Sequence, residues 1–187
     1  MRPPPALKLV ALAALAAAPH WTAAQDVKTT TTRTTSGERV VRVETTLRQS
    51  PETTWKWFST EEGLKCWVAP LVRLDLRTGG VLETNYDKSS AIGGAGTISL
   101  RILNYVENEV MTFKVKLNEA FSERLQSEDD NLQEVIQLQR LPNGTTRLVS
   151  SMVGWGSGAD WDRAITFFAR GNEWSYKELA KCAARSP

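Results

Sequence analysis

Residues 39–67 read RVVRVETTLRQSPETTWKWFSTEEGLKCW. From residue 41 to residue 47 the apolar and β-branched side chains alternate with polar ones, which is the period of a half-buried strand. Ser50 and Pro51 then favour the start of a helix, because serine caps free backbone amides and proline has no N–H to leave unpaired. Residues 60–67 predict a second helical segment. The stretch therefore predicts a strand followed by two short helices.

The chain beyond this stretch returns to a period of two, which predicts six further strands. They cover residues 72–76, 81–87, 97–106, 110–117, 132–141 and 146–153. Gly79-Gly80 and Asn143-Gly144 are typical of the tight turns that join antiparallel strands. We therefore expect a six-stranded antiparallel meander after the first strand.

After residue 158 the apolar period changes to 3.6 and predicts a long C-terminal helix. One face of this helix carries Trp161, Ile165, Phe168, Asn172, Ser175, Leu179 and Ala183. Asn172 and Ser175 are polar in the middle of this face, so either the helix overlooks a cavity there or these side chains reach the rim of the sheet. The predicted fold class is α+β, with an antiparallel sheet, two short helices and a long last helix.

Residues 1–24 have the pattern of an export signal. Arg2 and Lys8 lie at its start, an apolar run covers residues 9–18, and small residues end at Ala24. This run is half the length of about 20 residues that a membrane span needs; an uncleaved anchor or a buried helix is the alternative. We expect cleavage near Ala24, a secreted or periplasmic protein, and no stable membrane span.

Residues 25–38 are expected to form a flexible leader. Their threonine-rich sequence has few large apolar side chains whose burial would offset the loss of chain entropy. The folded domain is therefore expected at residues 39–187.

The chain has 23 Lys and Arg against 21 Asp and Glu. Loss of Arg2 and Lys8 with the signal leaves 21 against 21, a net charge of zero. A neutral body without a basic run predicts no nucleic-acid partner. The sole histidine, His20, would leave as well, which excludes histidine-dependent nucleophilic catalysis and the usual zinc or iron sites. We predict no metal site and no cofactor.

Cys66 and Cys182 are the only cysteines and do not form a CxxC motif. Two thiols do not complete a closed zinc site. In an exported protein they form either one disulfide or two buried small side chains, and their spacing alone does not decide between these.

Residues 154–159, GWGSGA, match the GxGxxG/A dinucleotide fingerprint. That fingerprint also requires a strand after the helix, and no strand is predicted there, so no dinucleotide cofactor is expected. Trp155 and Trp161 lie at this junction, where tryptophan either fills the core or lines a pocket.

Three side chains are candidates for acid–base chemistry: Glu83, Glu134 and Tyr86. Glu134 shares a strand face with Ile136 and Leu138; its alternative role is a charge on an edge strand. A perturbed pKa would be the first sign of a catalytic role.

The order of elements resembles that of the START-like, helix-grip superfamily, also called SRPBCC. Local sequence supports the resemblance: residues 41–44 leading into 50–55, then 58–64 with Cys66-Trp67, and the turn at 77–80, are similar to the branch related to activators of the heat-shock ATPase. The resemblance covers residues 39–184. It implies a curved sheet that grips the last helix, with a hydrophobic cavity between them.

The resemblance also implies a set of ligand-binding residues. They are Ile98, Leu100, Phe113, Val115, Ile136, Leu138, Met152 and Phe168, which the alternation also places on the inner face. Apart from the resemblance, the position of Trp155 and Trp161 at the helix junction and of Asn172 in the helix middle makes these three further candidates. In this fold the short helices support the far end of the last helix, which brings Cys66 and Cys182 together and favours a disulfide in an oxidising compartment.

We therefore expect an exported protein that binds a small apolar molecule, such as a lipid, without chemistry, under a lid formed by residues 88–96. One alternative is a lyase, cyclase or hydrolase that uses Glu83 or Glu134 with Tyr86. A second is an envelope interaction module whose pocket is filled by its own side chains. The oligomeric state stays open.

Overall fold

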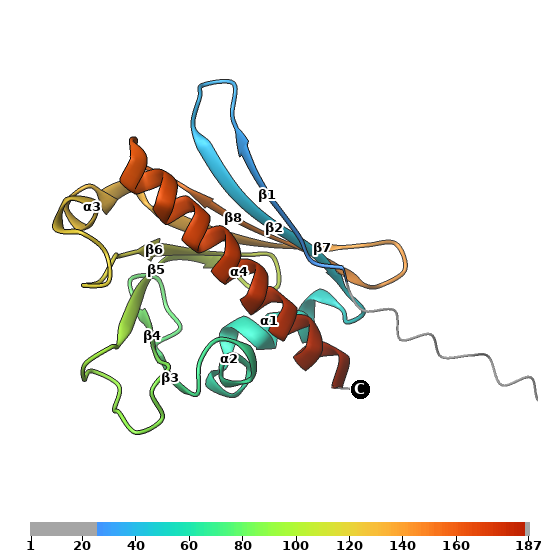
Figure 1. Ribbon diagram of the computed structural model, residues 1–187. Helices are drawn as coiled ribbons and strands as arrows, with labels where there is room; N and C mark the ends of the chain where they lie inside the picture. Colours follow the sequence, from blue (N-terminus) through green and yellow to red (C-terminus); the bar gives the residue numbers. More distant parts are fainter. Residues whose placement is uncertain (1–25, 186–187) are drawn as a thin grey trace, which may run out of the picture.

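A computed structural model describes residues 26–185 of the protein (Figure 1), and the predicted signal peptide lies outside them. One antiparallel sheet has the order β1-β2-β8-β7-β6-β5-β4-β3. Its strands are β1 (Lys28–Arg33), β2 (Arg39–Leu47), β3 (Leu71–Leu74), β4 (Val81–Asn85), β5 (Ile98–Val106), β6 (Val110–Val115), β7 (Gln133–Arg140) and β8 (Thr146–Val153). The six-stranded meander from β3 to β8 is confirmed.

The helices lie on one face of this sheet. They are α1 (Pro51–Ser59), α2 (Glu61–Trp67), the single-turn α3 (Glu123–Ser127), the 3-10 turn η1 (Asp129–Asn131) and α4 (Ala159–Arg185). Figure 1 shows α4 crossing the sheet diagonally, with α3 near its first turn and α1 and α2 near its C-terminal half. The predicted α+β helix-grip fold is therefore confirmed.

The first strand corrects the expected flexible leader. Residues 28–33 form β1, which pairs with residues 39–44 of β2, so two strands and not one precede the helices. Gly37, with φ of 88°, allows the tight turn between them. A strand beside an existing strand gains backbone hydrogen bonds, and β-branched threonine suits it, so large apolar side chains are not required.

The inward face of the sheet follows the predicted alternation. Inward side chains from β2, β6, β7 and β8 build two hydrophobic clusters, one around Trp55, Phe58 and Trp67 and the other around Trp161 and Leu125. The second cluster lies under the first turns of α4, and the first under its C-terminal half. A cavity lies between the two clusters.

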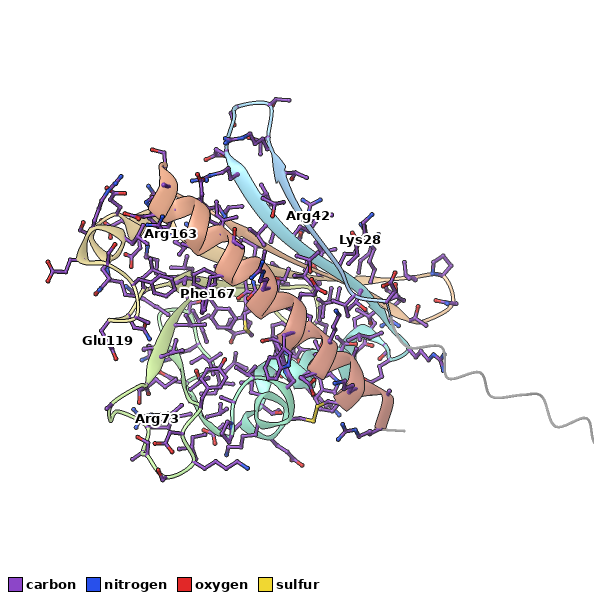
Figure 2. All side chains as sticks on the ribbon, in the orientation of Figure 1. Lys28, Arg42, Arg73, Glu119, Arg163 and Phe167 are labelled. Carbon is purple, nitrogen blue, oxygen red and sulfur yellow. A yellow bond between two sulfur atoms is a disulfide. The ribbon has the colours of Figure 1, made fainter. Side chains whose placement is uncertain are left out.

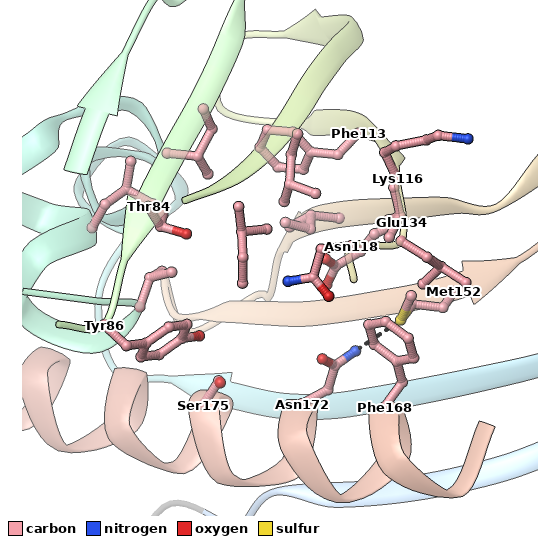
Figure 3. Close-up of a pocket in the computed structure, with 18 of the residues that line it drawn as sticks. Thr84, Tyr86, Phe113, Lys116, Asn118, Glu134, Met152, Phe168, Asn172 and Ser175 are labelled. Carbon is pink, nitrogen blue, oxygen red and sulfur yellow. Dashed lines mark hydrogen bonds between the residues drawn. The ribbon is translucent and has the colours of Figure 1, made fainter. Parts of the chain in front are cut away.

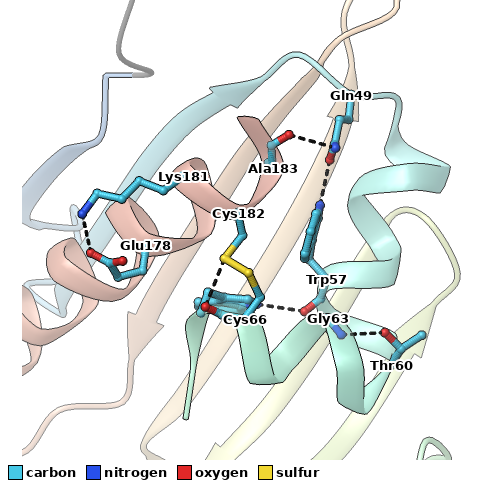
Figure 4. The surroundings of a disulfide bond; sticks show 10 residues. Gln49, Trp57, Thr60, Gly63, Cys66, Glu178, Lys181, Cys182 and Ala183 are labelled. Atoms are coloured by element: carbon cyan, nitrogen blue, oxygen red, sulfur yellow. Dashed lines mark hydrogen bonds and ion pairs between the residues drawn. A yellow bond between two sulfur atoms is a disulfide. The ribbon is translucent and has the colours of Figure 1, made fainter. Parts of the chain in front are cut away.

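The two short helices form as predicted and are joined to α4 by a disulfide. Ser50 caps α1 and Thr60 caps α2, each accepting a backbone N–H through its side-chain oxygen. Cys66 of α2 and Cys182 of α4 form the disulfide, with Cα atoms 6.2 Å apart (Figure 4), which confirms the expected pairing.

Hydrogen bonds beside the disulfide hold the same end of α4. The indole of Trp57 donates to Oε1 of Gln49 over 2.7 Å, and the Gln49 amide donates to the carbonyl of Ala183 over 3.1 Å (Figure 4). No helix within residues 26–185 combines the length and hydrophobicity that a membrane crossing requires.

Candidate ligand-binding cavity

A cavity of about 260 Å³ lies between the sheet and α4. Its wall is mainly apolar and comes from α1, α2, α4, the strands β4 to β8 and the segment after β6 (Figure 3). The volume lies just below the range of about 300–1,000 Å³ that is usual for sites of drug-sized ligands. The cavity therefore suits a small apolar molecule.

Eight of the eleven residues predicted to bind a ligand line this cavity. They are Ile98, Leu100, Phe113, Val115, Ile136, Met152, Phe168 and Asn172. For the six strand residues the agreement follows from the period of two, because side chains two residues apart point to the same face; Phe168 and Asn172 follow from the helical period of α4. Asn172 and Ser175 of α4 both face the cavity, so the polar middle of the helix overlooks a hollow.

The other three predicted residues lie outside the cavity wall. Leu138 belongs to the cluster under the C-terminal half of α4. Trp161 has no exposed surface, and its indole donates to Oε2 of Glu128 over 2.7 Å. Trp155 lies behind the wall, with its ring centroid 5.6 Å from that of Phe168. Both tryptophans pack in the cluster at the start of α4, and Trp155 supports the wall from outside.

Glu134 is the predicted acid–base candidate that lines the cavity from a half-buried position within the sheet. On β7 it pairs in register with Phe113 of β6 and Met152 of β8, both of which also line the cavity. Its Oε1 accepts hydrogen bonds from the hydroxyl of Ser150 over 2.6 Å and from that of Tyr176 over 3.0 Å. The alternation of β7 therefore turns this carboxyl inward.

Burial shifts the pKa values of this polar group. Removal from water raises the pKa of Glu134, while the hydrogen bonds from Ser150 and Tyr176 partly oppose that rise. Burial, together with the nearby carboxylate, raises the pKa of Tyr176 well above its ordinary value. Glu134 keeps some accessible surface and is one of the residues that line the cavity.

The other two acid–base candidates are placed differently. Glu83 points away from the cavity and pairs with Arg73 of β3, whose guanidinium Nε lies 2.6 Å from its Oε2. Tyr86 lines the cavity at its mouth, where the residue is 55% exposed. No direct contact joins Glu83 to Tyr86, so the structure does not assemble an acid–base pair from these two.

The segment that follows β6 forms part of the rim. Its residues Asn118, Ala120 and Phe121 line the cavity, and Phe121 stacks on Phe168 with centroids 5.6 Å apart. Phe167 of α4 (Figure 2) is 61% exposed, and its ring centroid lies 5.5 Å from that of Phe121. Several aromatic side chains therefore border the opening of the cavity.

Asp129 fixes the start of this rim segment. Its fully buried carboxylate accepts from the backbone N–H of Leu117 over 2.8 Å and from the ammonium of Lys116 over 2.6 Å. This buried carboxylate thus fastens η1 to the chain just beyond β6, and the ammonium of Lys116 is engaged by it.

The predicted lid does not contribute to the wall. No residue from 88 to 96 lines the cavity; only Tyr86 and Ile98, on either side of the loop, do so. The amide of Asn85 organises the loop, donating to the carbonyl of Ala95 over 3.0 Å and accepting from the backbone N–H of Asp87 over 2.9 Å. The rim at 118–121 takes the place expected for residues 88–96.

The glycine-rich sequence before α4 serves packing. A Cβ at Gly154 would lie 1.8 Å from the carbonyl oxygen of Asn131, and one at Gly156 would lie 2.1 Å from the indole nitrogen of Trp161. Close approach to these two neighbours explains both glycines without a bound phosphate. Among residues 26–185 no group of three metal-ligating side chains gathers.

Several lining residues were missed by sequence reasoning. They include Phe58, Leu64, Trp67, Thr84, Phe121, Phe167, Ser175 and Tyr176. The sequence did hint at Ser175, because it is a polar residue in the middle of the mainly apolar face of the predicted helix. Phe121 had none, because the connection that carries it has no periodic pattern.

Comparison with known proteins agrees with this fold. A family model described as Activator of Hsp90 ATPase homolog 1-like protein matches residues 48–184. A search of curated proteins found no significant match. Protein MLL2253 from Mesorhizobium loti is similar in structure, with a TM-score of 0.62 and 19% identity over 80% of this chain and 99% of that one.

Two further solved structures are similar. EF2215 from Enterococcus faecalis, described as a conserved protein of unknown function, has a TM-score of 0.61 and 14% identity over 86% of this chain and 80% of that one. The Aha1 dimer from Colwellia psychrerythraea has a TM-score of 0.56 and 14% identity over 76% of this chain and 98% of that one. At these identities the likeness concerns the fold alone.

Proposed function

Because the chain belongs to the family of activator of Hsp90 ATPase homolog 1-like proteins, we propose that it uses that fold to bind a small apolar molecule, as an exported protein and without performing chemistry. The observation that carries this proposal is the cavity of about 260 Å³ between the sheet and α4. Its mainly apolar wall with a few polar groups is typical of small-molecule sites.

Two features support export. The first is the basic start, apolar run and small residues of the sequence 1–24. The second is the disulfide between Cys66 and Cys182, since such bonds persist mainly in oxidising compartments. Expression of the full chain with measurement of its intact mass tests this proposal: processing near Ala24 supports export, and an unprocessed chain in the cytoplasm contradicts it.

The binding proposal is tested by native mass spectrometry and a thermal-shift screen of the purified protein against lipids and aromatic metabolites. A ligand that binds only the folded form raises the melting temperature through mass action. A co-purified mass or a concentration-dependent shift supports binding. If no compound shifts the melting temperature and no bound mass is found, the binding proposal is contradicted and the interaction module is favoured. The cavity itself argues against that module, whose pocket would be filled by its own side chains.

A second candidate function, acid–base catalysis, is favoured by one contact. Tyr176 and Glu134, both with raised pKa values, share a hydrogen bond of 3.0 Å at the cavity wall. An enzyme would change the mass of a bound compound over time. Conversion that stops in Glu134→Gln while binding persists would favour catalysis; a bound compound recovered unchanged favours the binding protein.

A further inference from the structure

Among residues 26–185, Glu134 is the only acidic side chain that lines the cavity, and no hydrogen bond or ion pair joins it to a cationic side chain. The other charged lining residue is Lys116, whose ammonium is bound to Asp129 and to the carbonyl of Gln126 over 2.6 Å and 2.9 Å. The nearest register partners of Glu134, Phe113 and Met152, offer no charge. The cavity therefore contains a carboxyl group that lacks a counter-charge.

The two oxygens of this carboxyl differ in their surroundings. Oε1 accepts from Ser150 of β8 and from Tyr176 of α4, so two separate elements hold the group in place. Oε2 has no hydrogen-bond partner within residues 26–185, and the residue faces the cavity. An acceptor held in this way, with two hydrogen bonds to one oxygen and none to the other, on a residue that lines the cavity, is suited to a donor that arrives with a ligand.

We infer that this donor is the ammonium group of an apolar amine, bound by Oε2 of Glu134 while the apolar part of the ligand occupies the rest of the cavity. The inference rests on the proposed function, since it names the ligand class for the same site. The ammonium would donate a hydrogen bond to Oε2, which has no donor. It would also bring the positive charge that the carboxyl has no partner for.

The alternatives fit this wall less well. A carboxylate ligand would place a second negative charge beside Glu134, which a site of low dielectric constant penalises. A neutral alcohol donates a weaker hydrogen bond than a charged donor. Aromatic rings also border the cavity, among them Phe113 and Phe168, and their faces attract a cation. The raised pKa of Glu134 agrees with a group whose counter-charge is absent from the chain.

Three probes with the same apolar chain test the inference: octylamine, octan-1-ol and octanoate. Their dissociation constants are measured by isothermal titration calorimetry at neutral pH on the protein with its disulfide intact. We expect octylamine to bind about tenfold or more tightly than octan-1-ol, and octanoate to bind most weakly. This ranking needs no variant and decides the inference even where a variant fails to fold.

Glu134→Gln tests the role of the carboxyl. The amide keeps an oxygen for Ser150 and Tyr176 but carries no charge, so octylamine affinity is expected to fall about tenfold or more while octan-1-ol affinity stays within about threefold. Glu83→Gln is the matched control, because that carboxylate lies outside the cavity wall and pairs with Arg73. It should leave the affinities of all three probes unchanged.

The outcomes separate this inference from the proposed function. Three results would contradict the inference that the ligand is an amine: equal affinities of the probes, tighter binding of octanoate, or an octylamine affinity that is the same in Glu134→Gln. The cavity would then be a general apolar site. No binding by any of the three probes, or by the lipids and aromatic metabolites of the thermal-shift screen, would overturn the proposed function itself.

Discussion

The hydroxyl of Tyr176 on α4 lies 3.0 Å from Oε1 of Glu134 on β7, which is 42 residues earlier in the chain. This bond crosses from the helix to the sheet beside the cavity. The helix therefore contributes more than an apolar cover: it fixes the orientation of the one carboxyl in the wall, and Asn172 and Ser175 of the same helix face the cavity near it.

The pH dependence of stability is expected to change in Glu134→Gln. Burial raises the pKa of Glu134 above its ordinary value of 4.5. Between that ordinary value and the raised one, the folded protein holds one proton more than the unfolded chain, so this group makes stability fall as pH rises through the window. The variant lacks this effect, and its free energy of unfolding relative to wild type should grow over the same window.

Urea unfolding at a series of pH values measures this difference. Comparison with the variant cancels groups that titrate in both proteins, such as Glu52, whose pKa the hydrogen bond from Arg140 lowers to about 2. The other titratable groups in the cavity wall are Tyr86, Lys116 and Tyr176, and all three are retained. Parallel curves for the two proteins would show that the carboxyl is not desolvated in the native state.

Loss of the disulfide should destabilise the protein strongly. The bond closes a loop with a sequence separation of 116 residues, and the chain-entropy model gives about 4 to 5 kcal/mol for such a loop. The double variant Cys66→Ser and Cys182→Ser should therefore unfold at lower urea concentration than the oxidised wild type. Reduced wild type is the control and should match the variant; a loss below about 1 kcal/mol contradicts the expectation.

Filling the cavity should abolish ligand binding without unfolding the protein. Ser175 lies on the cavity wall in the middle of α4, so Ser175→Phe places a ring in the hollow. We expect the ligand-induced thermal shift to disappear, with a change in unfolding free energy of about 1 kcal/mol or less in either direction. Ser175→Ala keeps the hollow and should retain the shift. An unchanged shift in Ser175→Phe would place binding elsewhere.

Two glycine-to-alanine variants should change stability in opposite directions. A Cβ at Gly156 would lie 2.1 Å from the indole nitrogen of buried Trp161, so Gly156→Ala is expected to cost about 1 to 3 kcal/mol through overpacking. A Cβ at Gly171 meets no heavy atom within 4 Å, so Gly171→Ala should stabilise α4 by about 0.5 to 1 kcal/mol. Thermal unfolding of both variants checks the signs, and destabilisation by Gly171→Ala would contradict the open surroundings of that residue.

The parts of the fold that sequence could predict are those with a regular period. Alternation placed Phe113, Val115 and Ile136 on the inner face, and the helical period placed Phe168 there as well. The period could not reveal β1, because its threonines carry no apolar contrast and the strand depends on backbone bonds to β2. It also could not decide that Trp161 is core, since the partner of its indole, Glu128, lies in an irregular connection.

Both ends of α4 are fastened to the rest of the molecule. Near its first turn, Arg39 of β2 bonds to Asp162 and to the carbonyl of Gly156; near its last turn, the disulfide and Gln49 hold it. Because α4 is held at both ends, the helix is not expected to move away from the sheet as a rigid body to open the cavity. Opening of the cavity mouth should therefore proceed by rotation of the ring side chains Tyr86, Phe121 and Phe167. Such motions of side chains and loops take picoseconds to microseconds and are faster than domain hinging.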